Sequence, residues 1–182
     1  YWDAAFVLPL AVGGRPPGSV AILGNAAGTV ARAYEHYFPV TRVDGVDLDG
    51  ELAEVGERFF GLGGANFQAH TADARPYLRA TERRYDSLIL DAYRQPYIPF
   101  YLTTREFFAL ARDRLNPDGS IVVNVGHPEG SQKLANVLAA TMGTAFENVW
   151  IDRTRDTNSM LVASDRAIDP SLDDSTFDAW WS

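Results

Sequence analysis

The strongest constraint in this sequence is a repeated alternation of short apolar runs with segments of helical periodicity. Runs of four to six residues with apolar, partly β-branched character are followed by stretches in which apolar residues recur every three or four positions. Such alternation predicts parallel strands joined by crossover helices. We expect strands over 19–23, 42–47, 66–69, 85–90 and 120–125, and helices over 29–38, 51–60, 74–80, 104–115 and 131–142.

Two further apolar runs, 147–152 and 159–163, flank the turn-rich segment 153–158 and indicate an antiparallel hairpin. The expected fold is α/β and Rossmann-like: a class I methyltransferase-type sheet of seven mostly parallel strands, closed by an antiparallel C-terminal hairpin. Ligands in such sheets bind beyond the carboxyl ends of the strands. The positions to inspect are therefore Gly24 to Gly28, Asp47, Thr71 to Asp73, Asp91 onward, and Asn124 to His127.

Length and composition limit the possible functions. The 182 residues fit one domain, expected over 1–168 and followed by a C-terminal tail at 169–182. The absence of cysteine excludes disulfides, zinc–thiolate sites and cysteine nucleophiles. A net charge of -8 opposes nucleic-acid binding and suits neutral or cationic small substrates. No apolar run is long enough to predict a membrane span, and the three scattered histidines, His36, His70 and His127, predict no metal site.

The turn after the first strand reads Gly24-Asn25-Ala26-Ala27-Gly28. Glycines at such a turn let the backbone approach a ligand closely at the N-terminus of the next helix. Ala26 and Thr29 stand where a dinucleotide fingerprint has its second and third glycines. The spacing of Gly24, Ala26 and Gly28 therefore favours an S-adenosyl nucleoside over NAD, although a plain strand-to-helix turn is the alternative.

Acidic residues follow the second and third expected strands. Asp47 lies at the end of the second strand, where a carboxylate can accept hydrogen bonds from both ribose hydroxyls. Asp49 is the better candidate for the cap of the next helix. Asp73 can accept a hydrogen bond from the exocyclic amine of a purine, or can cap the helix that begins at Ala74. Asp44 is expected to be a solvated strand residue.

Asp91 ends the fourth strand and opens a loop rich in tyrosine and proline, which ends at Leu102. A carboxylate there could take a proton from a substrate, while aromatic side chains such as Tyr93 screen it from water and stack on a base or a cation. The alternative is a hydrophobic lid or a dimer contact in which Asp91 forms a turn.

The order of these motifs resembles one family, the spermidine synthases and their bacterial spermidine synthase-like relatives. Tyr1-Trp2-Asp3 is similar to the tyrosine-x-acid stretch that precedes the glycine turn in that family, and 46–49 is similar to its nucleoside-binding second strand. The segment 85–91 is the closest match. The segments 102–108 and 158–164 resemble the helix after the catalytic loop and the final strand.

The resemblance implies a transferase that moves an aminopropyl group from decarboxylated S-adenosylmethionine to an amine acceptor such as putrescine and releases methylthioadenosine. It implies no tightly bound cofactor, and it carries the expectation of a cytoplasmic enzyme and of a possible homodimer. Asp91 matches the family's proton acceptor. The remaining site residues implied are a nucleoside set, Gly24, Ala26, Gly28, Asp47, Leu48, Asp73 and Ala74, and an acceptor set, Tyr1, Tyr93 and Arg94.

Three features depart from the family pattern. The turn 24–28 has no aspartate to hold the cosubstrate's amine, and Arg94 stands where the family carries a second loop aspartate. A guanidinium at about 4–6 Å from an ammonium group of a bound diamine would weaken binding by on the order of 1 kcal/mol where water is present. The loss would be larger where the two charged groups are desolvated. The family's N-terminal β-rich segment is also expected to be absent from this chain.

Two other functions stay open at this point. An S-adenosylmethionine-dependent methyltransferase would use the same fold and the same Asp47 and Asp73, and Arg94 could pair with the donor's carboxylate. A non-catalytic scaffold domain would keep the nucleoside-binding fold without an acceptor site.

Overall fold

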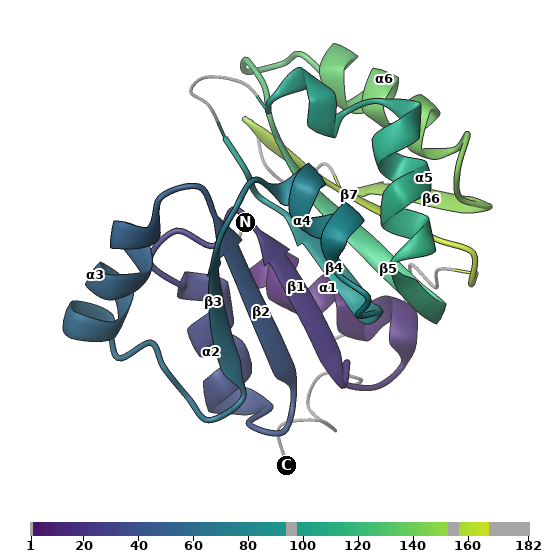
Figure 1. Cartoon of the computed structure of the whole chain (residues 1–182). Helices are drawn as coiled ribbons and strands as arrows, with labels where there is room; N and C mark the ends of the chain where they lie inside the picture. Colours follow the sequence, from purple (N-terminus) through teal and green to yellow (C-terminus); the bar gives the residue numbers. More distant parts are fainter. Residues whose placement is uncertain (1, 94–97, 153–156, 168–182) are drawn as a thin grey trace.

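A seven-stranded sheet forms the centre of the protein in the computed structural model, which describes residues 2–93, 98–152 and 157–167 (Figure 1). The strand order is β3-β2-β1-β4-β5-β7-β6; β7 pairs antiparallel with both β5 and β6, and the other pairs are parallel. This order confirms the expected methyltransferase-type sheet. The strands are β1 (Ser19–Leu23), β2 (Arg42–Asp47), β3 (Phe67–Thr71), β4 (Tyr85–Leu90), β5 (Leu115–Gly126), β6 (Asn148–Asp152) and β7 (Asn158–Ser164).

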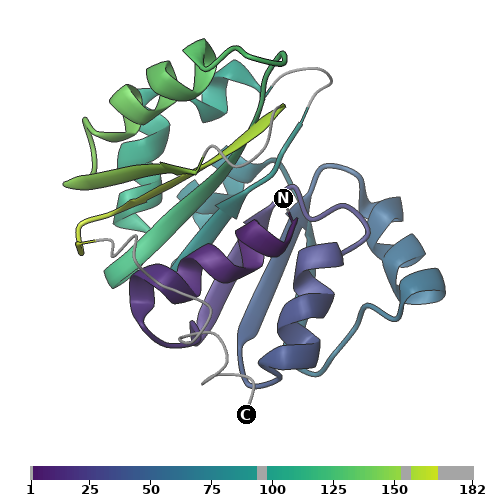
Figure 2. The ribbon, with the colours of Figure 1, turned by 180° about the vertical axis from the view of Figure 1, so that it is seen from behind.

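Helices cover both faces of the sheet. Figure 2 shows α1 and α2 together on one face, and α4, α5 and α6 lie on the other. Each face has its own group of buried apolar side chains, centred on Leu10 and Tyr34 under α1 and α2, and on Phe107 and Leu138 under α5 and α6. The helices are α1 (Trp2–Gly13), α2 (Thr29–Tyr37), α3 (Gly50–Phe60), α4 (Ala74–Ala80), α5 (Arg105–Asp113), α6 (Lys133–Met142) and the 3-10 helix η1 (Phe100–Leu102).

The helix α1 is not among the elements that the periodicity predicts. Its sequence is apolar at nearly every position and contains Pro9, so no polar face alternates with an apolar one. Phe6 and Leu10 pack into the core beside α2, and Ala5 and Val12 are also buried. A helix that is apolar on most sides carries no amphipathic signal, which is why its type could not be predicted.

The strand β5 begins earlier than expected. Leu115 pairs with Tyr85, and Ser120 pairs with Ser87. Five residue steps along β5 therefore lie opposite two residue steps along β4. The intervening turn contains Asp118, whose φ of 64° lies in the left-handed region. The residues 116–119, which lie between the expected helix and the expected strand, therefore form a turn that interrupts β5 and does not precede it.

Asp44 is fully buried in the middle of the sheet, so the expectation of a solvated side chain is wrong. Its carboxylate accepts hydrogen bonds from His70 Nε2 (3.0 Å), from Tyr85 OH (2.8 Å) and from Arg83 Nη1 (2.7 Å to Oδ1). Burial alone would raise the pKa of Asp44, but these hydrogen bonds and the Arg83 charge outweigh it and hold the pKa below its usual value. The partners come from β3, β4 and the turn before β4, which a local pattern in β2 cannot reveal.

No helix in the described part of the chain is long and apolar enough to cross a bilayer.

We predict that Asp44→Ala lowers the free energy of unfolding by about 1–3 kcal/mol, because it removes the acceptor of the buried Tyr85 hydroxyl and of the partly exposed His70 and Arg83 side chains. Urea unfolding followed by circular dichroism measures the loss. The matched control is Glu54→Ala, which removes an exposed acid of α3 and should change stability by no more than about 0.5 kcal/mol. A loss below about 1 kcal/mol for Asp44→Ala would contradict the structural role of this carboxylate.

Candidate active site

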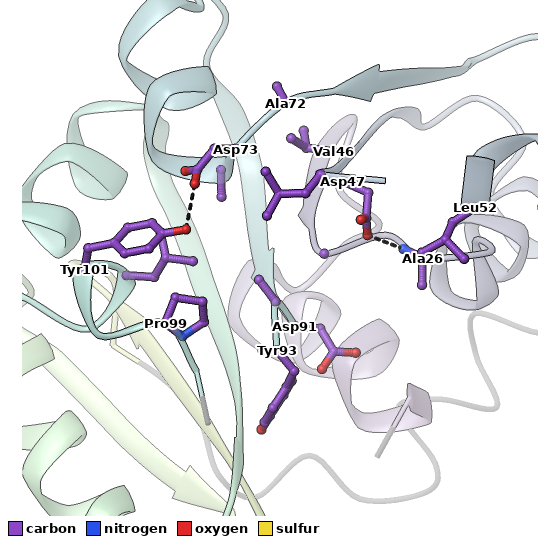
Figure 3. Close-up of a pocket in the computed structure, with 15 residues that line it drawn as sticks. Ala26, Val46, Asp47, Leu52, Ala72, Asp73, Asp91, Tyr93, Pro99 and Tyr101 are labelled. Atoms are coloured by element: carbon purple, nitrogen blue, oxygen red, sulfur yellow. Dashed lines mark hydrogen bonds between the residues drawn. The ribbon is translucent and has the colours of Figure 1, made fainter. Parts of the chain in front are cut away.

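A cavity of about 490 Å³ opens at the carboxyl ends of β1, β2 and β4 (Figure 3). This is the edge of a doubly wound sheet at which ligands are expected. Eight of the eleven predicted site residues line the cavity. They are Gly24, Ala26, Asp47, Leu48, Asp73, Ala74, Asp91 and Tyr93.

Of the three other predicted residues, one lies away from the described cavity and two fall outside the described residues. Gly28 is the N-cap of α2, with a φ of 84°, and a Cβ there would lie 2.6 Å from Leu62 Cδ1. Gly28 therefore allows the turn to pack against Leu62 and contributes no cavity surface. Tyr1 and Arg94 lie outside the described residues.

Gly24 is the glycine that the cavity requires. Its φ is 94°, and a Cβ at this position would lie 2.6 Å from the backbone of Asp91 and Ala92. Any side chain would push the end of β4 away from the turn after β1. The close approach brings Asp91 to the same cavity as the glycine turn.

Asp47 organises the turn as well as facing the cavity. Its Oδ2 accepts a hydrogen bond from the backbone N–H of Ala26 (2.8 Å), and its Oδ1 accepts one from the N–H of Asp49 (3.1 Å). Ala26 has a positive φ of 45°, so this hydrogen bond supports a conformation that alanine seldom adopts. Asp49 caps α3 by accepting from Glu51 N–H, as expected, and leaves Asp47 to the turn and the cavity.

Asp73 caps α4 and also lines the cavity. Its Oδ1 accepts from Arg75 N–H (2.9 Å) and caps α4, while its Oδ2 accepts from Tyr101 OH (2.6 Å) at the cavity wall (Figure 3). Each carboxylate oxygen can accept more than one hydrogen bond, so the cap does not prevent contact with a ligand. Tyr101 also lines the cavity.

Tyr101 is absent from the predicted site set. The sequence shows an aromatic loop after Asp91, but it does not show which tyrosine turns inward. That choice depends on η1, and on Arg75 Nη1, which donates to the carbonyl oxygen of Tyr101 over 3.0 Å.

Asp91 is a partly buried acid at the cavity, directly after β4. Its Oδ1 accepts a hydrogen bond from Asn124 Nδ2 over 2.8 Å. Burial raises the pKa of Asp91 to about 6, and the hydrogen bond from Asn124 opposes part of that rise. A carboxyl group with this pKa is largely ionised at neutral pH and can still exchange a proton readily.

Tyr93 lies beside Asp91 at the end of β5. Its hydroxyl donates to the carbonyl oxygen of Asn124 (2.9 Å) and accepts from Gly126 N–H (2.6 Å). These contacts hold the start of the loop after β4 against the carboxyl end of β5. Asn124 lies in the range 124–127, which was expected near a ligand, and it contacts both Asp91 and Tyr93.

The cavity combines acidic and apolar surfaces. Asp47, Asp73 and Asp91 contribute three carboxyl groups, and none of the described lining residues is lysine, arginine or histidine. The apolar part comes from side chains such as Leu52 and Pro99. No group of three or more potential metal ligands occurs among the residues that the structure describes. This arrangement suits a ligand that combines a flat apolar body with hydroxyl, amine or cationic groups.

The fold and the position of the cavity define the chain as a Rossmann-like, methyltransferase-type domain with an acidic site at the carboxyl edge of its sheet. The family model described as "Spermine/spermidine synthase domain" matches residues 9–152. The chain belongs to this family.

Curated relatives agree with this assignment. The chain is 32% identical over 149 residues to a "Probable polyamine aminopropyl transferase" of Bifidobacterium longum, a match that covers 81% of this chain and 33% of that protein. It is 33% identical over 134 residues to a polyamine aminopropyltransferase of Vibrio vulnificus, covering 71% of this chain and 44% of that protein. The matches thus span less than half the length of these two relatives.

Solved structures share the fold. A probable spermidine synthase from Corynebacterium glutamicum superposes with a TM-score of 0.82 at 26% identity, over 98% of this chain and 67% of that chain. The spermidine synthase from Thermotoga maritima gives a TM-score of 0.78 at 18% identity, over 100% of this chain and 70% of that chain.

We predict that Asp91→Asn stabilises the unliganded protein by about 1–3 kcal/mol at pH 8. The raised pKa means that ionisation disfavours the folded state, so the parent loses stability as pH rises from the ordinary value of 3.8 through about 6. The variant keeps an acceptor for Asn124 and has no charge to bury. Urea unfolding at pH 4 and pH 8 measures the difference, which should nearly vanish at pH 4. The control Glu54→Gln, at an exposed position of α3, should show no such pH dependence. An Asp91→Asn variant that is less stable to unfolding than the parent at pH 8 would refute the prediction.

Proposed function

We propose that this chain is the nucleoside-binding domain of a transferase that moves an aminopropyl group from decarboxylated S-adenosylmethionine to an amine acceptor and releases methylthioadenosine. The observation that carries the proposal is the partly buried Asp91, with a pKa of about 6, in a cavity that also contains Asp47 and Asp73. Membership of the spermine/spermidine synthase family supports the choice of reaction.

The nucleoside would lie along the edge formed by β1, β2 and α4. We assign the ribose hydroxyls to Asp47, whose oxygens keep free lone pairs beside the turn at Gly24 and Ala26. The exocyclic amine of adenine would donate to Asp73, and Leu48 and Ala74 would supply apolar surface to the base. The acidic cavity suits the decarboxylated nucleoside, which is cationic at both its sulfonium and its amine.

The proposed chemistry requires one proton transfer. An alkylammonium group has a pKa near that of lysine, about 10.4, and its nitrogen can attack only after it loses a proton. The Asp91 carboxylate would bind the ammonium and accept that proton. The freed nitrogen lone pair then forms a bond to the carbon beside the sulfonium, the carbon–sulfur bond breaks, and its electron pair leaves with neutral methylthioadenosine.

The organisation of the chain forms part of the proposal. Residues 1–168 would constitute the nucleoside-binding domain, with 169–182 as a tail. A homodimer and a cytoplasmic location are expectations taken from the family resemblance. Tyr1 and Arg94 would belong to the acceptor site together with Tyr93.

We predict that Asp47→Ala weakens methylthioadenosine binding by about 1.5–3 kcal/mol, because charged hydrogen bonds to the ribose are lost. Isothermal calorimetry measures the affinity, and circular dichroism confirms that the variant is folded. Glu54→Ala serves as the control and should bind like the parent. Unchanged affinity in folded Asp47→Ala would remove the ribose assignment. Preference of the parent for S-adenosylmethionine over its decarboxylated form would instead favour a methyltransferase, and failure to bind either nucleoside would favour a scaffold.

We predict that turnover with putrescine is slow or absent in the parent, because the Arg94 guanidinium repels the distal ammonium of a diamine. Arg94→Asp should improve putrescine binding, whereas Asp91→Asn should abolish transfer by removing the proton acceptor. Steady-state release of methylthioadenosine by the parent and both variants is the measurement. Efficient putrescine turnover by the parent would show that Arg94 points away from the acceptor. Activity that survives Asp91→Asn would eliminate the proposed mechanism.

A further inference from the structure

A line of hydrogen bonds joins Asp91 to the first residue of β7. Asn158 Nδ2 donates to Asn124 Oδ1 over 2.9 Å, and Asn124 Nδ2 donates to Asp91 Oδ1 over 2.8 Å. Antiparallel pairing places Asn158 opposite Gly126, next to the end of β5. Asn158 does not line the cavity, so it reaches the carboxylate only through Asn124.

The two ends of the Asn124 amide have opposite hydrogen-bonding chemistry. Its NH₂ group faces an ionised acid, and its carbonyl oxygen faces a donor. Exchanging the ends would set the oxygen against the Asp91 carboxylate and would set one NH₂ group against the NH₂ of Asn158. Because Asn124 is only 3% exposed, water cannot readily replace either partner.

The orientation of Asn158 is itself supported. Its Oδ1 accepts a long hydrogen bond from Thr157 Oγ1 (3.4 Å), which leaves its NH₂ group directed at Asn124. The neighbouring strands fix the backbone, since β7 pairs with β5 over seven positions that begin at Asn158. The geometry therefore favours one arrangement of both amides while Asp91 is ionised.

We propose that Asn158 is a positioning residue for Asp91, because it holds Asn124 in the orientation that donates a hydrogen bond to the ionised carboxylate. Only the kinetic readout of this inference rests on the proposed function. The orientation of Asn124 acts on the Asp91 carboxyl group whether or not the protein transfers an aminopropyl group.

The direction of the effect follows from the electrostatics of Asp91. Burial raises its pKa, and the hydrogen bond from Asn124 opposes that rise. Removing the NH₂ donor of Asn158 lets the Asn124 amide turn. The Asp91 carboxylate then loses part of the hydrogen bonding that stabilises its ionised form, and its pKa increases. The titratable groups around this line of amides, among the described residues, are Asp47, Asp73, Tyr93 and Tyr101 at the cavity, His127 after β5 and Asp152 at the end of β6.

Carbon-13 NMR of the side-chain carboxyl groups tests the proposal without a substrate. The Asp91 signal is assigned by its absence from Asp91→Asn. In Asn158→Ala, the titration midpoint of Asp91 should rise by on the order of 0.5–1 pH unit. Asn158→Asp has nearly the shape of the parent and offers only acceptors, so it should raise the midpoint further and serves if the alanine variant does not fold.

A double-mutant cycle separates the effect that Asn158 exerts through Asn124 from the direct effect of the charge that Asn158→Asp introduces. In an Asn124→Ala background, Asn158→Ala should leave the midpoint of Asp91 unchanged, and Asn158→Asp should retain only its through-space charge effect. The matched control is Asn66→Ala, which removes an asparagine that donates to Pro39 O at the amino-terminal edge of β3. This control should not move the Asp91 midpoint.

The kinetic readout is the pH dependence of methylthioadenosine release. The acid limb of kcat/KM should move to higher pH in Asn158→Ala, while kcat at high pH stays near the parent value because Asp91 is ionised there. A midpoint within about 0.2 unit of the parent, or an equal shift in the Asn124→Ala background, would overturn the proposal. A shifted midpoint in a protein that releases no methylthioadenosine would leave this inference standing and would refute the proposed function alone.

Discussion

The site depends on a contact that permits no side chain. β1 and β4 are neighbours in the sheet, and the backbone of Asp91 and Ala92 passes so close to Gly24 that a Cβ would lie 2.6 Å away. The same turn is tied to β2 through the hydrogen bond from Ala26 N–H to Asp47. The close backbone contact joins the ends of β1 and β4, and the Asp47 carboxylate joins the ends of β1 and β2. These two contacts bring the ends of three strands to one cavity, and every proposed role of that cavity requires them.

Much of the fold could be predicted because the central strands are buried on both faces. The bounds of β1, β2 and β4 match their expected ranges, and the apolar runs at 20–23 and 88–90 are typical of such buried strands. The helix α1 could not be predicted because its apolar residues surround Pro9 and show no periodic polar face. The start of β5 was missed because the turn residues at 116–119 resemble the end of a helix, whereas the chain there leaves the strand and returns to it.

The candidate site was predictable in part because its acids stand at the ends of predicted strands. Asp47, Asp73 and Asp91 follow strands that end at one edge of the sheet, so strand order alone places them together. The partners of these acids come from distant segments, as when Tyr101 bonds Asp73 or Asn124 bonds Asp91, and no local pattern encodes such pairs. The wrong expectation for Asp44 has the same origin, because its partners lie 26 to 41 positions away in the chain.

The acids of the cavity differ in what the fold gains from them. Asp47 supports the turn at Ala26 and Asp73 caps α4, so both would be retained by a descendant that had lost all chemistry. The Asp91 carboxylate accepts its hydrogen bond from a side chain, Asn124, and from no backbone group in the described structure, and burial disfavours its ionised form. Genetic drift would therefore remove Asp91 early once selection for the reaction stopped. If the proposed function holds, Asp47 and Asp73 would report the survival of the fold among related sequences, whereas Asp91 would report the survival of the proposed reaction.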